Sequence, residues 1–231
     1  MILAIETATE HAGLALLEDA SVLAERHLAR ERQHARSLLT ELDLLLAACG
    51  RRLEDVKLIA LSIGPGSFTG LRIGLATALG LCFGTARKII PVPTLAALSL
   101  HAGETAKIVP LLDARRQQVY TGLYGPQGVS LREDRVCDPR PWFEALRDEG
   151  PLSLLGPAAQ LYRKAAVEIL GDAVHIHEAS LGRPRAASVG RLSLRLLQEG
   201  AACAPEAVEL RYLRRAEAEE KRELDTLSGN P

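Results

Sequence analysis

Aromatic residues are scarce in this chain. Phe, Trp and Tyr make up 3% of its 231 residues, so we do not expect a platform of stacked rings for single-stranded bases. An excess of basic residues is also missing, because 28 Lys and Arg face 29 Asp and Glu and leave a net charge of -1. Proteins that bind nucleic acids alone usually carry such an excess. Any contact with RNA is therefore expected through a partner protein or a local patch.

Long hydrophobic runs are missing as well. No stretch approaches the roughly 20 apolar residues that cross a bilayer, and Met1–Glu6 lacks the basic segment that begins a secretory signal. We therefore expect a cytoplasmic protein with no membrane contact. Hydrophobic residues still reach 47% of the chain, which is enough to fill a globular core.

Metal-binding motifs are also lacking. The cysteines are too far apart in sequence for a zinc knuckle or a redox pair, and we expect reduced, packed thiols. The histidines are scattered, apart from His175 and His177, which alternate as residues of a strand do. Neither HExxH nor HxxxH occurs, so a metalloprotease, which would need such a motif, is disfavoured. We predict no metal site.

The first hundred residues show clear periodicity. Apolar runs separated by short turns predict an antiparallel meander of three strands, at Ile2–Glu6, Ala12–Leu17 and Val22–Leu28. The spacing of the following apolar residues predicts helices that alternate with buried strands. The helices are expected at Ser37–Cys49, Phe68–Gly84 and Thr94–His101, and the strands at Leu58–Ile63 and Lys88–Val92. This order is typical of one lobe of the actin-like ATPases and sugar kinases.

The pattern restarts near residue 104 and is weaker. Strands are predicted at Ile108–Leu112, Gln118–Tyr124, Ser153–Leu155 and Ala173–Ile176, and helices at Arg140–Arg147, Ala158–Leu170 and Ala187–Leu197. The sequence thus predicts an α/β protein with a two-lobed actin-like ATPase/sugar-kinase (ASKHA) fold and an abbreviated second lobe. We expect an N-terminal lobe at 1–103, a C-terminal lobe at 104–203, and a C-terminal segment with a charged tail at 204–231. Within that tail, Arg211–Glu223 is interpreted as a solvated helix or a frayed end.

One segment, Gly64–Gly74, is the motif that says most about function. Its sequence GPGSFTGLRIG forms a turn between a strand and a helix, in which Ser67 is a candidate N-cap. Exposed backbone at the start of a helix can bind an anion, but no Lys-Ser or Lys-Thr follows, so this is not a Walker phosphate loop. A structural role is favoured over phosphate binding. The residues of this helix-start loop, our candidate anion contact, are Gly64, Pro65, Gly66, Ser67, Phe68, Thr69 and Gly70.

The helix after this loop has an unusual surface. Gly66, Gly70, Gly74 and Ala78 recur every four residues and form a narrow ridge. Glycines inside a helix cost about 1 kcal/mol each relative to alanine, so tertiary packing must hold this helix. Two explanations stay open: close packing within its own lobe, or a helix-pair interface with another chain. An adjoining apolar stripe is formed by Leu71, Leu75, Leu79, Cys82 and Phe83.

Several segments resemble one known family. The opening ILAIETAT, His34 with Ser37-Leu38-Leu39, and the string GPGSFTGLRIG resemble segments of the TsaB family, also called YeaZ. The GPGSFTGLRIG string is the specific one, and the resemblance is densest over residues 1–125. Further matches are Ile89–Leu95, Asp113-Ala114-Arg115, Val119-Tyr120 and Tyr212-Leu213-Arg214.

The resemblance implies a function. TsaB proteins are inactive paralogues of TsaD, which transfers a threonylcarbamoyl group to adenosine 37 of ANN-decoding tRNAs. The resemblance implies that this chain is a non-catalytic partner subunit that pairs with TsaD and recruits the ATPase TsaE. It would meet tRNA indirectly, and ATP would be used by the partner proteins rather than bound here as a cofactor. The implied interface lies on two helices, Ser37–Cys49 and Phe68–Gly84, with the residues Leu38, Leu42, Leu45, Leu46, Phe68, Leu71, Arg72, Leu75 and Leu79.

Particular positions indicate that the chain is inactive. The metal-binding HxxxH pair of TsaD corresponds to Thr94 and Leu98 here, which do not ligate metals as paired imidazoles do. The phosphate motif Asp-x-Gly-Thr is absent, because Glu6-Thr7-Ala8-Thr9 follows Ile5. Glu6 also replaces the aspartate that is usual in the family. We therefore predict no catalytic residue.

Other functions remain as alternatives. The chain could be an independent ATP-binding enzyme of the actin-like and sugar-kinase superfamily, which the missing phosphate motifs disfavour. In the absence of its partner, we expect a symmetric homodimer that covers the apolar helix pair. The residues expected in that dimer are Leu38, Leu42, Leu45, Leu71 and Leu75.

Overall fold

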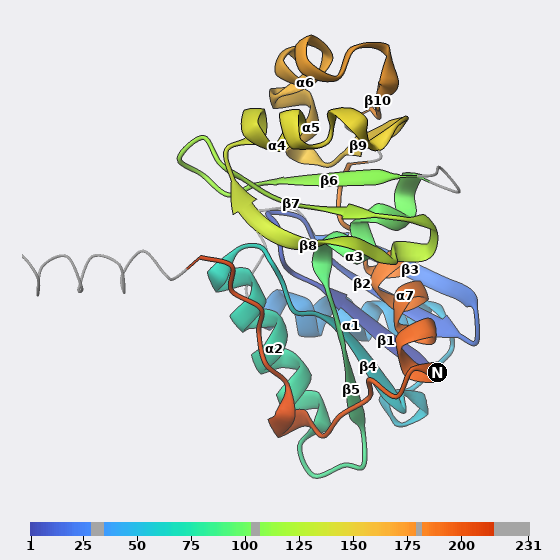
Figure 1. Ribbon diagram of the computed structural model, residues 1–231. Coiled ribbons are helices and arrows are strands. Elements are labelled where there is room, and N and C mark those ends of the chain that lie inside the picture. Colours follow the sequence, from blue (N-terminus) through green and yellow to red (C-terminus); the bar gives the residue numbers. More distant parts are fainter. Residues whose placement is uncertain (29–34, 103–106, 179–181, 215–231) are drawn as a thin grey trace, which may run out of the picture.

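The computed structural model describes residues 1–28, 35–102, 107–178 and 182–214. Two five-stranded mixed sheets, each covered by helices, form two lobes that lie one above the other in Figure 1. His34 and the part of the predicted tail beyond residue 214 lie outside the described residues. No helix in the described ranges is both long and apolar enough to cross a membrane.

The first sheet has the strand order β3-β2-β1-β4-β5. The pairs β1–β2 and β2–β3 are antiparallel, which confirms the predicted meander, and β1–β4 and β4–β5 are parallel. The bounds are Ile2–Glu6 (β1), Ala12–Glu18 (β2), Ser21–Leu28 (β3), Leu58–Ser62 (β4) and Lys88–Val92 (β5).

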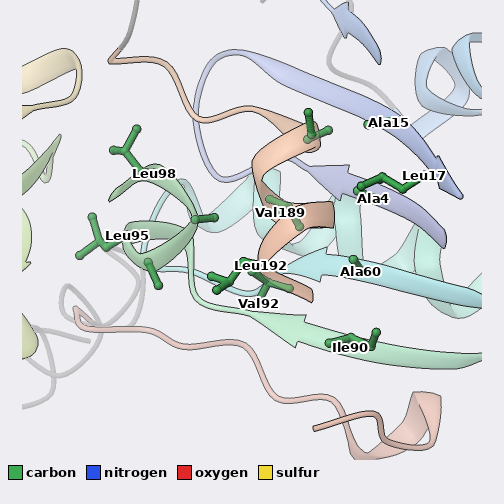
Figure 2. Close-up of a cluster of buried hydrophobic side chains, with 14 of the residues drawn as sticks. Ala4, Ala15, Leu17, Ala60, Ile90, Val92, Leu95, Leu98, Val189 and Leu192 are labelled. Carbon is green, nitrogen blue, oxygen red and sulfur yellow. The ribbon is translucent and has the colours of Figure 1, made fainter. Parts of the chain in front are cut away.

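Helices cover both faces of this sheet, because alternate residues of each strand point to opposite sides. On one face, Leu3 and Ile5 of β1 pack against α1 (Ala35–Ala48) and α2 (Phe68–Cys82). On the other face, Ala4 packs with α3 (Thr94–Ser99) and α7 (Ala186–Gln198). Figure 2 shows this second cluster, in which Val189 and Leu192 of α7 lie over the sheet.

The second sheet has the order β10-β9-β6-β7-β8. Its face away from the first lobe packs against α4, α5 and α6, and α3 lies against its other side, between the two sheets (Figure 1). The strands are Ile108–Asp113 (β6), Val119–Tyr124 (β7), Ser130–Cys137 (β8), Leu152–Leu155 (β9) and Val174–Ile176 (β10). The helices are Pro139–Ala145 (α4), Pro157–Leu161 (α5) and Arg163–Leu170 (α6).

Two features of the second lobe differ from the prediction. Strand β8 was not predicted, because it is an edge strand of sequence SLREDRVC in which only Asp134 is buried. The helix predicted at Ala158–Leu170 is divided at Tyr162, whose backbone leaves the helical region. Short 3₁₀ turns complete the chain, at Leu53–Asp55, Leu100–Ala102, Pro126–Gly128, Arg147–Glu149, Gly171–Ala173 and Pro205–Ala207.

The predicted C-terminal lobe, residues 104–203, includes a helix that packs in the first lobe. Helix α7 lies within the range assigned to the second lobe, but it packs on β1, β2 and β5 of the first sheet. Cys203 then forms an antiparallel bridge with Ile89 at the edge of β5. The chain therefore returns to the first lobe, because the apolar face of α7 completes a core that strands β1, β2 and β4 leave open.

Candidate functional site

The helix-start loop caps α2. The hydroxyl of Ser67 accepts a hydrogen bond from the Gly70 amide at 3.2 Å, as the N-cap prediction requires. The Ser67 amide donates to the Ala8 carbonyl at 2.6 Å, and Gly64 and Thr94 exchange two hydrogen bonds of 2.9 and 3.1 Å. The loop is thus fixed on both sides by the turn after β1 and by the start of α3.

The glycine ridge faces inward. A Cβ atom at Gly66 would lie 2.3 Å from the Ala8 carbonyl oxygen. At Gly70 it would lie 2.1 Å from the Thr7 carbonyl oxygen, and at Gly74 it would lie 2.3 Å from the Thr7 hydroxyl. Such distances are far below van der Waals contact, so only glycine lets α2 approach the turn after β1 this closely. Packing within the lobe therefore explains the ridge, and the ridge is not an interface with another chain.

Most of the predicted interface leucines are also buried in the chain's own core. The structure places the side chains of Leu38, Leu42, Leu45 and Leu46 in the first-lobe core. Leu71 is fully buried as well. They cannot contribute to an outer surface, which corrects both the predicted partner contacts and the predicted dimer contacts at these five positions. The half-buried Leu75 packs against the same core.

The outward face of these helices carries other hydrophobic residues. Of the predicted set, Arg72 and Leu79 are exposed and Phe68 is half-buried. The structure adds Leu39, Leu44 and Phe83, of which Phe83 is 89% exposed. The sequence analysis missed Leu39 and Leu44, because leucines occur on both sides of α1 and the spacing alone does not tell the inner side from the outer.

An aromatic cluster marks the start of α2. The Arg72 guanidinium carbon lies 3.8 Å from the centre of the Phe68 ring, and the ring centres of Phe68 and Tyr212 are 5.0 Å apart. The Nε of Arg72 donates to the Tyr212 hydroxyl at 3.4 Å. This helix face is therefore joined to the C-terminal segment of the chain.

Residues 211–214, which we call the strap, connect the two lobes. The Arg211 amide donates to the Ile63 carbonyl in the first lobe at 2.7 Å. Its guanidinium donates to Asp134 Oδ2 of the second lobe, also at 2.7 Å. Arg214 donates to the Ala114 carbonyl at 2.6 Å, again in the second lobe. Arg211 and Arg214, which the sequence analysis placed in a solvated tail, are therefore held by specific contacts.

The carboxylate of Asp134 is the buried centre of this connection. Its side chain is 1% exposed, and burial raises its pKa, while the hydrogen bond from the Tyr124 hydroxyl and the charge of Arg211 act in the opposite direction. Burial and the neighbouring Asp134 raise the pKa of Tyr124 as well, so this phenol stays protonated.

A cleft of about 630 Å³ lies between the lobes and the strap. The first lobe contributes the turn after β1 and the helix-start loop, and the second lobe contributes the ends of β6 and α5 and the side chain of Tyr120. Its polar lining carries both signs of charge, at Glu10, Asp113, Arg115, Arg211 and Arg214.

Glu6 lies outside the lining of this cleft. It is fully buried, its Oε1 accepts the Ala8 amide at 2.6 Å, and its Oε2 has no hydrogen-bond partner among the residues that the structure describes. Burial raises its pKa from 4.5 to about 7, against the opposing effects of the Ala8 amide and the Ser62 hydroxyl. This carboxyl group is therefore a structural group that changes its charge near neutral pH.

Thr94 and Leu98, at which the family resemblance implied the loss of a metal-binding pair, hold structural side chains. The Thr94 hydroxyl accepts the Gly64 amide, and Leu98 is buried in the hydrophobic core. In the described part of the chain, no three His, Cys, Asp or Glu side chains lie close enough together to bind a metal ion.

The two lobes, their strand orders and the cleft between them define a protein of the actin-like ATPase and sugar-kinase fold. The ROK hexokinase of Thermus thermophilus has this fold, with a TM-score of 0.53 over 86% of this chain and 99% of that chain, at 12% sequence identity. At that identity the likeness concerns the fold alone.

Closer relatives share the sequence as well. Residues 21–222 match the profile of the family described as "TsaD: tRNA N6-adenosine threonylcarbamoyltransferase". The "tRNA threonylcarbamoyladenosine biosynthesis protein TsaB" of Bacillus subtilis (strain 168) is 32% identical over 95% of this chain and 96% of its own length. The structure of YeaZ from Pseudomonas aeruginosa superposes with a TM-score of 0.76, at 29% identity over 92% of this chain and 99% of that chain. The chain belongs to the TsaB (YeaZ) family.

Proposed function

We propose that this protein is a non-catalytic subunit in the biosynthesis of threonylcarbamoyladenosine on tRNA. In this proposal it pairs with the catalytic subunit TsaD and recruits the ATPase TsaE to the pair. The observation that carries the proposal is the likeness to the Bacillus subtilis protein along nearly the whole of both chains. Since tRNA is the substrate of this pathway, we place the protein in the cytoplasm.

The outward face of α1 and α2 supports the pairing. Leu39 and Leu44 of α1, Leu79 of α2 and Phe83 just after it are exposed large hydrophobic residues. Exposed hydrophobic side chains gathered on one helix pair are typical of protein interfaces. We propose that TsaD binds this face, together with Phe68 and Arg72, and that a second copy of the chain covers it when TsaD is absent.

The chemistry of the described residues supports a non-catalytic role. Thr94 and Leu98 are engaged in the fold, and Glu6 does not line the cleft. A substrate in the cleft would therefore not reach the Glu6 carboxylate. We propose that ATP is used by the partner proteins and that this chain needs no cofactor of its own.

Transfer of labelled threonine to unmodified tRNA tests the proposal. TsaD, TsaE and the separate enzyme that makes threonylcarbamoyl-adenylate from ATP, threonine and bicarbonate are purified. They are assayed with and without this chain, and the chain is also assayed alone. We expect transfer only when this chain accompanies the others, and none with the chain alone. Equal transfer in its absence would contradict the proposal.

One observation favours a second function. The cleft between the lobes is large enough for a small ligand, as an independent ATP-binding enzyme of the same superfamily would require. Titration of the chain alone with ATP distinguishes the two functions. Tight binding together with ATP hydrolysis would favour the enzyme over the partner subunit.

A further inference from the structure

The two lobes share one hydrophobic core around α3, which lies between the sheets in Figure 1. Leu98 of α3 lies in this core with Ile90 of β5 and Leu112 of β6, which belong to different sheets. The second lobe also approaches α3 closely at Gly128, where a Cβ atom would lie 2.9 Å from the Ala96 carbonyl oxygen. Separating such a packed core is costly. Because no residue of α3 lines the cleft, α3 is a pivot beside it.

At the cleft, the strap lies with its backbone on the first lobe and its arginine side chains on the second. The Arg211 amide donates to the Ile63 carbonyl, and a Cβ atom on Gly64 would lie 2.5 Å from the Arg211 carbonyl oxygen. The guanidinium groups of Arg211 and Arg214 reach a carboxylate of β8 and a carbonyl group after β6. This contact consists of a few polar bonds, whereas α3 lies in a continuous core. We therefore expect the lobes to part at the strap and to stay together at α3.

Tyr212 follows Arg211 in the strap and contacts the start of α2. Its ring packs on the Phe68 ring, and its hydroxyl accepts the Arg72 Nε at 3.4 Å. Tyr212 is 40% exposed and Arg72 is exposed, so this contact is accessible from the outward face of α2. A long hydrogen bond to a neutral phenol is weak, and a carboxylate would bind the same guanidinium more strongly.

We propose that the strap is a latch on the cleft, released when an acidic side chain of a partner protein takes Arg72 from Tyr212. While Tyr212 is bound to α2, the strap arginines hold the second lobe and the strap forms one wall of the cleft. When Tyr212 leaves, the strap loses this contact with the first lobe, the lobes turn about α3 and the cleft widens. The partner drives the change because it binds the open arrangement better than the closed one. The trigger rests on the proposed function, which places a partner on this face, whereas the latch does not.

Hydrogen exchange of the Arg211 amide in the chain alone tests the latch. This amide bonds to the Ile63 carbonyl, so it exchanges when the strap leaves the first lobe. Tyr212→Ala removes both the ring contact and the hydroxyl, and it is expected to speed this exchange about tenfold. Arg72→Ala leaves the contact between the Phe68 and Tyr212 rings, and it is expected to speed the exchange about threefold.

Two controls separate release of the strap from a general loss of stability. Phe83→Ala removes an exposed aromatic side chain at the other end of α2 and is expected to leave exchange at Arg211 unchanged. The Ser67 amide, which bonds to the Ala8 carbonyl, is expected to keep its protection in Tyr212→Ala. Unchanged exchange at Arg211 in Tyr212→Ala, or equal acceleration at Ser67 and Arg211, would overturn the inference.

Residual dipolar couplings of the strand amides measure the angle between the two sheets. In the unmodified chain, the couplings of both sheets are expected to fit the structure with one alignment tensor. In Tyr212→Ala the two sheets are expected to need different tensors, because the lobes then move relative to one another. Faster exchange at Arg211 with one shared tensor would mean that the strap moves without opening the cleft, and the inference would be wrong.

The trigger is tested in the complex with TsaD, by mass spectrometry of exchange in peptides that contain the strap. Exchange is expected to be faster in the complex than in the chain alone, and slower or equal exchange would overturn the trigger. Co-purification with TsaD and threonine transfer are measured on the same preparation. If both are intact and the strap does not respond, only the inference fails. If TsaD does not bind, the proposed function and the trigger fail together, and the measurements on the chain alone still decide the latch.

Discussion

Arg211 joins the first lobe through its backbone and the second lobe through its side chain. Its amide bonds to Ile63 at the end of β4, and its guanidinium bonds to the buried carboxylate of Asp134 on β8. One residue thus holds the two sheets together at the edge of the cleft, although it follows the last described helix by more than ten residues.

Loss of the Arg211 guanidinium should destabilise the protein. Arg211→Ala leaves the Asp134 carboxylate buried with only the Tyr124 hydroxyl, and a buried charge that loses its ionic partner costs about 3 kcal/mol, somewhat less here because Arg211 is part-exposed. Chemical denaturation measures the change. As a control, Arg140→Ala breaks an exposed pair with Glu168 and should cost less than about 1 kcal/mol. Equal effects of the two variants would contradict the role of Arg211.

The charge of Glu6 should make stability fall as the pH rises. Its pKa is about 7 in the folded protein against an ordinary value of 4.5, so the folded state binds this proton more tightly than the unfolded chain does. The stabilisation is complete below pH 4.5 and is lost as the pH rises through 7, by about 3 kcal/mol in all.

The variant Glu6→Gln removes this dependence. Its stability relative to the unmodified chain should increase between pH 5 and pH 8, as measured by denaturation at each pH. The variant Glu144→Gln, at an exposed position, is the control. Its stability should equal that of the unmodified chain at pH 5 and at pH 8. If the difference in free energy of unfolding between Glu6→Gln and the unmodified chain does not change with pH, Glu6 does not titrate in this range.

Two glycines of α2 should respond to alanine in opposite directions. Gly70→Ala places a Cβ atom 2.1 Å from the Thr7 carbonyl oxygen, and overpacking of this kind costs about 1–3 kcal/mol or more. Gly80 lies on the exposed side of the same helix, and nothing lies within 4 Å of its added Cβ. Gly80→Ala should therefore stabilise the protein by about 1 kcal/mol. Thermal melts of both variants measure the difference, and destabilisation by Gly80→Ala would contradict it.

Charges on the outward face should prevent pairing without unfolding the chain. Leu79→Glu/Phe83→Glu is expected to abolish co-purification with TsaD and to shift any homodimer to monomer in sedimentation, with an unchanged circular dichroism spectrum. Leu161→Glu, at an exposed leucine of α5 in the other lobe, is the control. By contrast, Leu42→Glu would place a charge in the first-lobe core and unfold it. Normal pairing by Leu79→Glu/Phe83→Glu would place the partner elsewhere.

Local patterns predicted most of the first lobe. The meander, the parallel strands β4 and β5, and the cap at Ser67 follow from alternation, apolar runs and the chemistry of the N-cap. The direction in which α2 turns its glycines could not be predicted, because it depends on the contact with Thr7 and Ala8, about sixty residues away in the sequence.

Other features could not be predicted, because they depend on contacts between residues that are distant in the sequence. The sequence of β8 is polar and does not predict a strand, which forms by pairing with β7. The dense mixture of charges in the strap predicts a solvated tail. It does not show that two of these residues, Arg211 and Arg214, have specific partners in the second lobe. The inner and outer leucines of α1 became distinguishable only when the sheet was in place.

The return of α7 to the first sheet has a consequence for synthesis of the chain. Domains usually fold as units, and those nearer the N-terminus fold first during translation. Here one face of the strands made first is covered only in part, by α3, until Ala186–Gln198 has been made. The strands and helices of the second sheet are continuous from β6 to β10 and are complete before α7 appears. The sheet that begins the protein is therefore the last to be finished on the ribosome.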